Sequence, residues 1–106
     1  MEQMELTAET VAKWLGYEVD DVDADAMGMI IPAIKVTVTN WHGEPEKWGD
    51  RVTMGSIMLA AHLYRRRATP GGVAEFQAEG RTYVQRHDPQ AAMLLGLGAW
   101  GRPVVA

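Results

Sequence analysis

The stretch that decides the fold is RVTMGSIMLAAHLYRRR, residues 51–67. Apolar or small side chains fill nearly all of its middle, and at helical spacing they cover more than one face. Its basic end suits the negative pole of a helix dipole, and the TPGG at 69–72 cannot continue a helix. We therefore expect a central helix, capped by Asp50 and buried on several sides in a bundle or between subunits.

The segment before this helix has two competing periods. Apolar residues recur at helical spacing over residues 27–41, whereas residues 34–39 alternate apolar and polar side chains as a half-buried strand does. Pro32 would kink a helix here, but the residue one turn back is Gly28, which obstructs the proline ring least. We favour a kinked helix and keep the strand as the alternative.

Shorter helices are expected at both ends of the chain. Residues 6–16 have the apolar spacing of an amphipathic helix, with Thr7 as its N-cap. Asp88 and Pro89 form an N-cap and a first helical position, which predicts a short helix over residues 90–95.

The connection over residues 73–86 contains alternating side chains and a turn candidate at Gly80, so we expect an irregular or hairpin-like excursion. The expected fold is mainly α: a small bundle of about four helices with a long loop or hairpin and an extended C-terminal tail. Residues 1–98 would form a single helical domain and residues 99–106 the tail.

Length and composition agree with one globular domain. The chain has 106 residues, of which 47% are hydrophobic and 23% charged, and this balance excludes wholesale disorder. No apolar stretch approaches the ~20 residues of a bilayer-spanning helix. The first ten residues carry three glutamates where a secretory signal would carry basic residues. We expect a soluble, unexported chain without a membrane partner.

Charge is divided unevenly along the chain. Residues 1–50 hold eleven acids and three lysines, a net charge of −8, whereas residues 51–106 have a net charge of +4. If the two halves lie on different surfaces, copies would attract one another head to tail, and such contacts can close into a ring.

The acidic run over residues 20–25 has two interpretations. As a solvated turn it would cap the following helix with negative charge at the positive end of the helix dipole. Asp21, Asp23 and Asp25 also match the first ligand positions of an EF-hand loop, but Ala26 replaces its glycine and Pro32 its bidentate glutamate. The mismatches favour the helix cap, so no metal site is expected.

No catalytic set is recognisable. The chain has no cysteine, and its one serine, Ser56, lies six residues before His62, out of reach on a helix. His87 beside Asp88 resembles half of a catalytic pair, but no nucleophile or third group is identifiable, so a surface histidine beside a helix cap is favoured. His42 and His62 have no neighbouring ligand at metal spacing. The glycines of 96-GLGAWG-101 lack the strand and helix context of a dinucleotide site. We expect no enzyme activity, cofactor or metal.

Three consecutive arginines, Arg65, Arg66 and Arg67, allow a nucleic-acid interpretation because guanidinium groups neutralise phosphates. Cations in a last helical turn also complement the helix dipole without any ligand. The acidic excess opposes DNA binding, so protein partners are favoured. The alternative is a small nucleic-acid-binding regulator or packaging subunit that uses these arginines with Arg81 and Arg86.

The C-terminal residues have no helical pattern but are largely apolar, and such tails usually dock on the parent domain or on a partner. Trp and Arg are the residue types most common at binding hot spots. The candidate partner-binding residues of the tail are Trp100, Arg102, Pro103 and Val104.

Roughly half the chain resembles the head-to-tail adaptor (head-tail connector) proteins of long-tailed bacteriophages. The residues that carry the resemblance are RVTMGSIMLAAHLYRRR at 51–67, TPGGVA at 69–74, YVQRHDP at 83–89 and MLLGLG at 93–98. The resemblance implies a ring of twelve copies, located at the head–tail interface of the virion and assembled in the host cytoplasm. Such a ring joins the portal protein to the stopper or tail-completion protein, and genomic DNA passes through its lumen.

This implied role assigns the charged residues to surfaces. An acidic lumen would let DNA slide without sticking, because like charges repel. Candidates for lining the lumen are Asp20, Asp21, Asp23 and Asp25. Candidates for the interface between subunits are Arg65, Arg66, Arg67 and Arg81.

Overall fold

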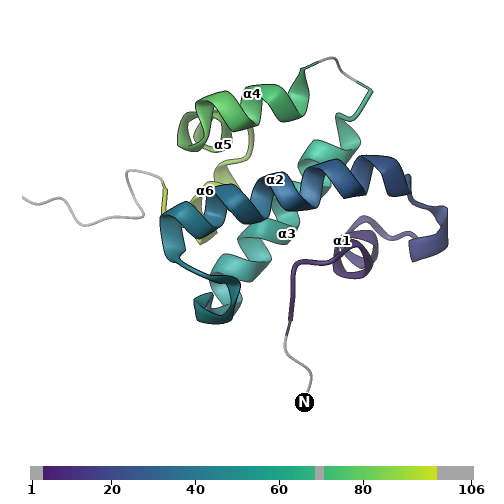
Figure 1. Ribbon diagram of the computed structural model, residues 1–106, viewed down its shortest axis with the longest axis horizontal. Helices are drawn as coiled ribbons and strands as arrows, with labels where there is room; N and C mark the ends of the chain where they lie inside the picture. Colours follow the sequence, from purple (N-terminus) through teal and green to yellow (C-terminus); the bar gives the residue numbers. More distant parts are fainter. Residues whose placement is uncertain (1–3, 69–70, 98–106) are drawn as a thin grey trace, which may run out of the picture.

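The computed structural model describes residues 4–68 and 71–97, which are helical apart from short connections (Figure 1). The elements in chain order are α1 (Ala8–Leu15), η1 (Val19–Asp21), α2 (Ala24–His42), η2 (Pro45–Lys47), α3 (Asp50–Arg65), α4 (Gly72–Glu79), α5 (Arg81–His87) and α6 (Pro89–Leu94). These two ranges contain no strand. The mainly α prediction is therefore confirmed, with six α-helices in place of about four.

Helix α3 is the centre of the bundle and packs against α1, α2 and α6. Its buried residues include Gly55, Ser56, Leu59 and Leu63, so the helix is covered on more than one side as its apolar sequence predicts. The helix begins one residue earlier than expected: Gly49 is the N-cap and Asp50 is already helical. Asp50 therefore places its negative charge in the first turn, at the positive end of the dipole.

Helix α2 continues unbroken through residues 34–39, which settles the choice between helix and strand. Ile34 and Val38 are fully buried, while Val36 between them is 65% exposed. On a strand all three would share one face, whereas on a helix Val36 turns away from the other two. Pro32 lies inside the helix on its solvent side, and the carbonyl it leaves without a donor belongs to Gly28.

The expectation of an irregular or hairpin-like connection over residues 73–86 is wrong. This segment forms two helices, α4 and α5, separated at Gly80, where φ is +54°. Tyr83 and Val84 are both fully buried, and adjacent residues would point to opposite faces of a strand. Burial of Phe76, Tyr83 and Val84 in the common core outweighs the short alternation that favoured a hairpin.

The terminal helices begin at the predicted caps. The Thr7 hydroxyl accepts a hydrogen bond from the Thr10 backbone N–H, and α1 ends at Gly16 with φ of +85°. The Asp88 carboxylate caps α6 and Pro89 is its first residue. The predicted tail, residues 99–106, lies outside the described residues.

Candidate interaction surface

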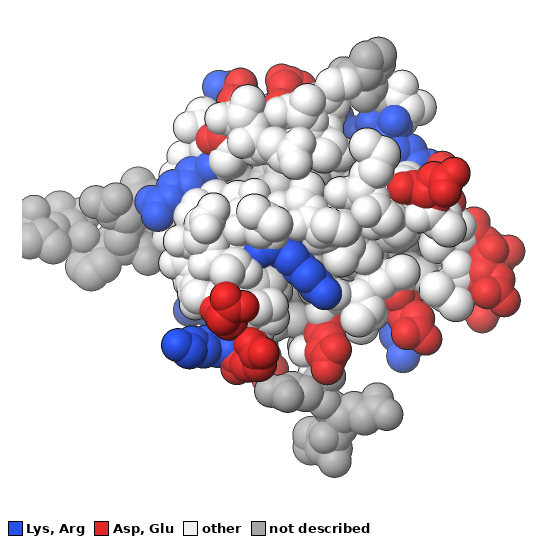
Figure 2. Space-filling model, viewed as in Figure 1, with Lys and Arg blue, Asp and Glu red and all other residues white. Residues whose placement is uncertain are grey.

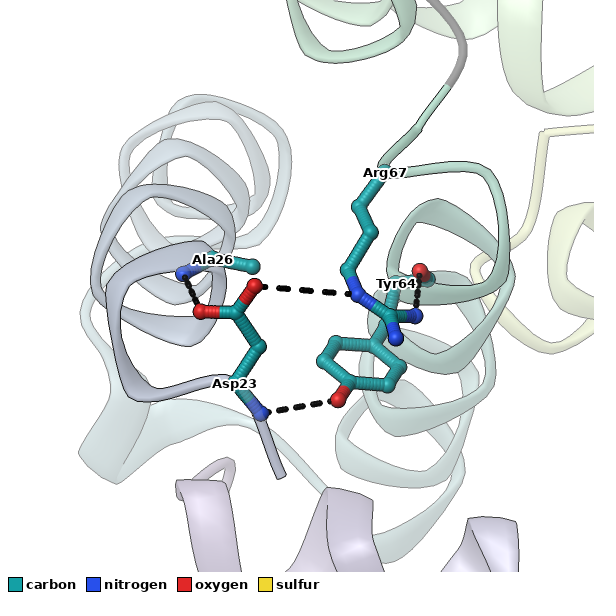
Figure 3. Close-up of polar contacts among 4 residues, drawn as sticks. All are labelled: Asp23, Ala26, Tyr64 and Arg67. Atoms are coloured by element: carbon teal, nitrogen blue, oxygen red, sulfur yellow. Dashed lines mark hydrogen bonds and ion pairs between the residues drawn. The ribbon is translucent and has the colours of Figure 1, made fainter. Parts of the chain in front are cut away.

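The basic end of α3 meets the acidic start of α2 in a small cluster of polar contacts (Figure 3). The Asp23 carboxylate accepts a hydrogen bond from the Ala26 N–H at 3.1 Å and so caps α2. The Asp23 N–H donates to the Tyr64 hydroxyl at 2.8 Å. Arg67 completes the cluster, because its Nε lies 3.8 Å from Asp23 Oδ2 and its guanidinium lies 3.9 Å from the centre of the Tyr64 ring.

This cluster brings together charges from the two halves of the sequence. Head-to-tail attraction was predicted on the condition that the acidic and basic halves lie on different surfaces. At the Asp23–Arg67 ion pair they share one surface, because α2 starts where α3 ends. Both side chains are about half exposed, so the pair itself contributes only ~0.2–1 kcal/mol.

The arginines predicted for one subunit interface lie at separate places. Arg65, Arg66 and Arg67 are at the end of α3, beside the start of α2. Arg81 lies 6.0 Å from the centre of the Trp41 ring, near the other end of α2. Since a helix rises 1.5 Å per residue, the two positions are about 27 Å apart along α2.

A groove containing two of these arginines runs between the first half of α2, the end of α3 and the start of α4. Its volume is about 310 Å³. We call it the arginine groove, and its lining includes Met29, Ile30, Leu63, Arg66, Arg67 and Val73. Its lining includes no acidic residue. It therefore combines an apolar floor with positive charge at its edge.

A second groove, about 380 Å³ in volume, lies between α1, η1 and α2. Its lining is apolar and includes Val19, Val22, Met27, Ile31 and Pro32; we call it the apolar groove. Successive residues of a helix are rotated by about 100° about its axis, so the α2 residues that line the apolar groove lie roughly half a circle away from those that line the arginine groove. The two grooves therefore lie on opposite sides of α2.

Between the two grooves, the outer side of α2 carries apolar side chains in contact with solvent. Met29 is 66% exposed and Val36 is 65% exposed, while Pro32 lies between them at helical spacing. We call these three residues the α2 ridge. Met29 also lines the arginine groove and Pro32 also lines the apolar groove, so the ridge connects the two grooves. Exposed apolar side chains gathered in this way are typical of interaction sites.

The predicted lumen residues lie at one end of the molecule. Asp20 and Asp21 are in η1, Asp23 caps α2 and Asp25 is in its first turn, and all four are exposed. Figure 2 shows acidic side chains gathered at the end of the molecule where α1 connects to α2. Within the described ranges, no three His, Asp or Glu residues are placed to hold a metal ion.

Two histidines that have no partner in the sequence lie together in the fold. His62 Nε2 is 3.2 Å from the Tyr83 hydroxyl, and the His87 ring is centred 4.4 Å from the Tyr83 ring and 6.1 Å from the His62 ring. Burial lowers the pKa of His62, as do Arg66, His87 and Arg65, against the opposing effect of Asp88. The sequence signal for the contact between Tyr83 and His87 is their spacing of four residues, which places both on one face of a helix.

The other candidate catalytic groups have structural contacts. The Ser56 hydroxyl is fully buried and donates to the Val52 carbonyl one turn back. His42 Nε2 lies 2.7 Å from the carbonyl oxygen of Leu95 and so links α2 to the end of α6. Neither Ser56 nor His42 lines either of the two grooves.

No family model matches this chain. The curated proteins and the solved structures contain no significant match either. None of the helices in the described ranges is long and apolar enough to cross a bilayer. The resemblance to phage head-to-tail adaptors therefore stays a prediction from the sequence, and the candidate site is defined by the α2 ridge, its two grooves and the charged end of α2 and α3.

Proposed function

We propose that this protein is a head-to-tail adaptor, a structural virion protein that forms a ring between the portal and the tail or stopper. The observation that carries the proposal is the α2 ridge with a groove on each side. Met29 and Val36 expose about two thirds of their surface, a larger fraction than any other large apolar side chain among the described residues. A surface of this kind serves protein contacts better than catalysis.

The proposed ring would sit at the head–tail interface of the virion after assembly in the host cytoplasm. Genomic DNA would pass through it without sequence-specific contacts. Exposure of the four aspartates at one end of the molecule is compatible with a lumen lining. The proposed tail contacts to the portal or a neighbouring ring involve Trp100, Arg102, Pro103 and Val104, which lie outside the described residues.

The alternative function, a regulator or packaging subunit that binds nucleic acid through arginines, has less support. Arg67 is paired with Asp23, and Arg86 lies 3.5 Å from Glu79. Both cations are therefore partly neutralised within the chain. DNA affinity that falls steeply with salt concentration would favour this alternative over the adaptor.

Electron microscopy of the purified protein mixed with the matching portal ring, compared with the portal alone, tests the adaptor role. We expect an added ring of density at the outer end of the portal. A bare portal, both alone and when attached to DNA-filled heads, would contradict the proposal. The added density would also show which surface of each subunit faces the portal.

A further inference from the structure

The arginine groove has the chemistry of a site for an acidic segment with apolar side chains. Arg66 lines the groove and has no carboxylate within 4 Å among residues 4–68 and 71–97. The floor is formed by apolar residues, including Leu63 and Val73, and Met29 at its edge is 66% exposed. An occupant that complements this groove brings negative charge to Arg66 and an apolar side chain to the floor.

The chain itself presents such a segment on its surface. Residues 17–21, which we call the acidic turn, have the sequence YEVDD, and every one of them is exposed. Tyr17 is 53% exposed and Val19 is 40% exposed, so two apolar side chains project beside three carboxylates. Large apolar side chains exposed in an acidic turn cost solvation free energy that a partner surface would recover.

We infer that the arginine groove of one copy receives the acidic turn of a second copy. The inference rests on the proposed function in one respect, because a ring requires contacts between copies. It goes further by naming the two surfaces that meet. Glu18, Asp20 and Asp21 supply the charge opposite Arg66, and Val19 or Tyr17 enters the apolar floor. Asp20 and Asp21 would then lie in the contact between copies instead of in the lumen, which leaves Asp23 and Asp25 as the lumen candidates.

The acidic turn does not occupy the arginine groove of its own chain. It packs against α1, and Val19 lines the apolar groove. The apolar groove is on the opposite side of α2 from the arginine groove, and Figure 1 shows the α1–α2 connection and the start of α4 on opposite sides of α2. Two complementary surfaces on opposite sides of one helix make a heterologous contact, which repeats from copy to copy and closes into a ring when the rotation allows.

The absence of cysteine from the chain makes this contact directly testable by crosslinking. One variant carries Val19→Cys in the acidic turn and a second carries Ala74→Cys, which lies on α4 at the edge of the groove. The two are given tags of different size, mixed and treated with a short bifunctional maleimide. The matched control replaces Ala74→Cys by Ala78→Cys, one turn further along α4, exposed and outside the groove.

We expect the mixed dimer of Val19→Cys with Ala74→Cys to form several-fold more than the mixed dimer with Ala78→Cys. Adding Arg66→Glu to the Ala74→Cys chain should lower the yield several-fold, because attraction becomes repulsion. Adding Asp20→Arg and Asp21→Arg to the Val19→Cys chain should restore the yield of mixed dimer with the chain that carries Arg66→Glu. Helical circular dichroism of each variant verifies that the chain remains folded.

The inference would be overturned if the mixed dimer formed in equal yield with Ala74→Cys and with Ala78→Cys, or if Arg66→Glu left the yield unchanged. Failure of this contact is distinguishable from failure of the adaptor role. If the mixed dimer forms but the portal stays bare in electron microscopy, the contact between copies is supported and the adaptor role is contradicted. If the portal gains a ring of density but the mixed dimer does not form, the adaptor role is supported and this contact is contradicted.

Discussion

The Tyr83 hydroxyl lies 3.2 Å from Nε2 of His62, which joins α5 to α3 by a polar contact. Tyr83 is fully buried, and its ring also packs at right angles, within about 20°, against Phe76 of α4. A buried hydroxyl needs a partner, and His62 provides it. Burial of the imidazole lowers the pKa of His62, and Arg66 and Arg65 add to this against the opposing effect of Asp88, so the fold favours neutral His62.

Stability should therefore fall as the solution becomes acidic. The pKa of His62 is lowered in the fold, chiefly by burial, from the ordinary 6.5. His62 therefore binds a proton more readily in the unfolded chain than in the folded one. The contribution of neutral His62 to the free energy of unfolding is complete above about pH 6.5 and is lost as the pH falls through the lowered pKa. Urea unfolding midpoints between about pH 7.5 and pH 5 measure this.

The His62→Gln variant is the control for that measurement, because an amide does not titrate and can still reach the Tyr83 hydroxyl. We expect its stability to depend less on pH than that of the natural chain over the same range. Parallel curves for the two proteins would mean that His62 does not carry the effect.

Replacing Gly55 should destabilise the bundle although alanine is the better helix former. A Cβ atom at Gly55 would lie 2.9 Å from Leu95 Cγ and 3.1 Å from Leu94 Cβ, so α3 and α6 could not keep their approach. Overpacking costs about 1–3 kcal/mol, and the gain in helix propensity of about 1 kcal/mol offsets only part of it. We expect Gly55→Ala to lower the free energy of unfolding by about 1 kcal/mol.

Gly28 provides the matched comparison. It lies in α2, and nothing lies within 4 Å of a Cβ atom built on it. Gly28→Ala should therefore raise the free energy of unfolding by about 0.5–1 kcal/mol. Destabilisation at both glycines in urea titrations would contradict the close approach of α3 and α6 as the cause.

Tyr64→Phe should weaken the junction between α2 and α3. The variant keeps the ring under Arg67 but removes the hydroxyl that accepts the Asp23 N–H at 2.8 Å. We expect a loss of about 0.5–1.5 kcal/mol in the free energy of unfolding. Tyr17→Phe, at a position 53% exposed, should change it by less than about 0.5 kcal/mol. Equal effects at the two tyrosines would rule out the Asp23 contact as the source.

Charge on the α2 ridge should impair assembly without unfolding the chain. At Val36, 65% exposed, the change Val36→Glu should alter the free energy of unfolding by less than about 0.5 kcal/mol. The same change replaces an apolar side chain by a charged one on the proposed adaptor surface. The added ring of density on the portal, which we call decoration, should therefore be lost in electron microscopy. Gln77→Glu, on an exposed position of α4, should leave decoration intact.

Deletion of Trp100–Ala106 should leave the bundle folded. The described core extends from Leu6 to Leu97, with α1, α2 and α6 packed against α3, and α4 and α5 packed against α2 and α6. Because the tail is proposed to bind the portal or a neighbouring ring, the truncated protein should fail to enter particles. Loss of helical circular dichroism in the truncated protein would place the tail in the core instead.

Local signals in the sequence predicted most helix ends and missed two helices. Thr7, Gly16, Asp88 and Pro89 act through neighbours within a few residues, so their roles are readable without the fold. The local pattern over residues 73–86 does not reveal α4 and α5, because these helices are only eight and seven residues long and are stabilised mainly by burial against other elements.

The sequence by itself determined the central helix, the N-caps of α1, α2 and α6, and the absence of cysteine chemistry. These depend on side-chain pattern and local hydrogen bonding. Only the tertiary structure decided that Asp23 meets Arg67, that His62 meets Tyr83 and that grooves flank the α2 ridge. Such relationships join residues more than twenty positions apart, and their geometry follows from how whole helices pack around α3.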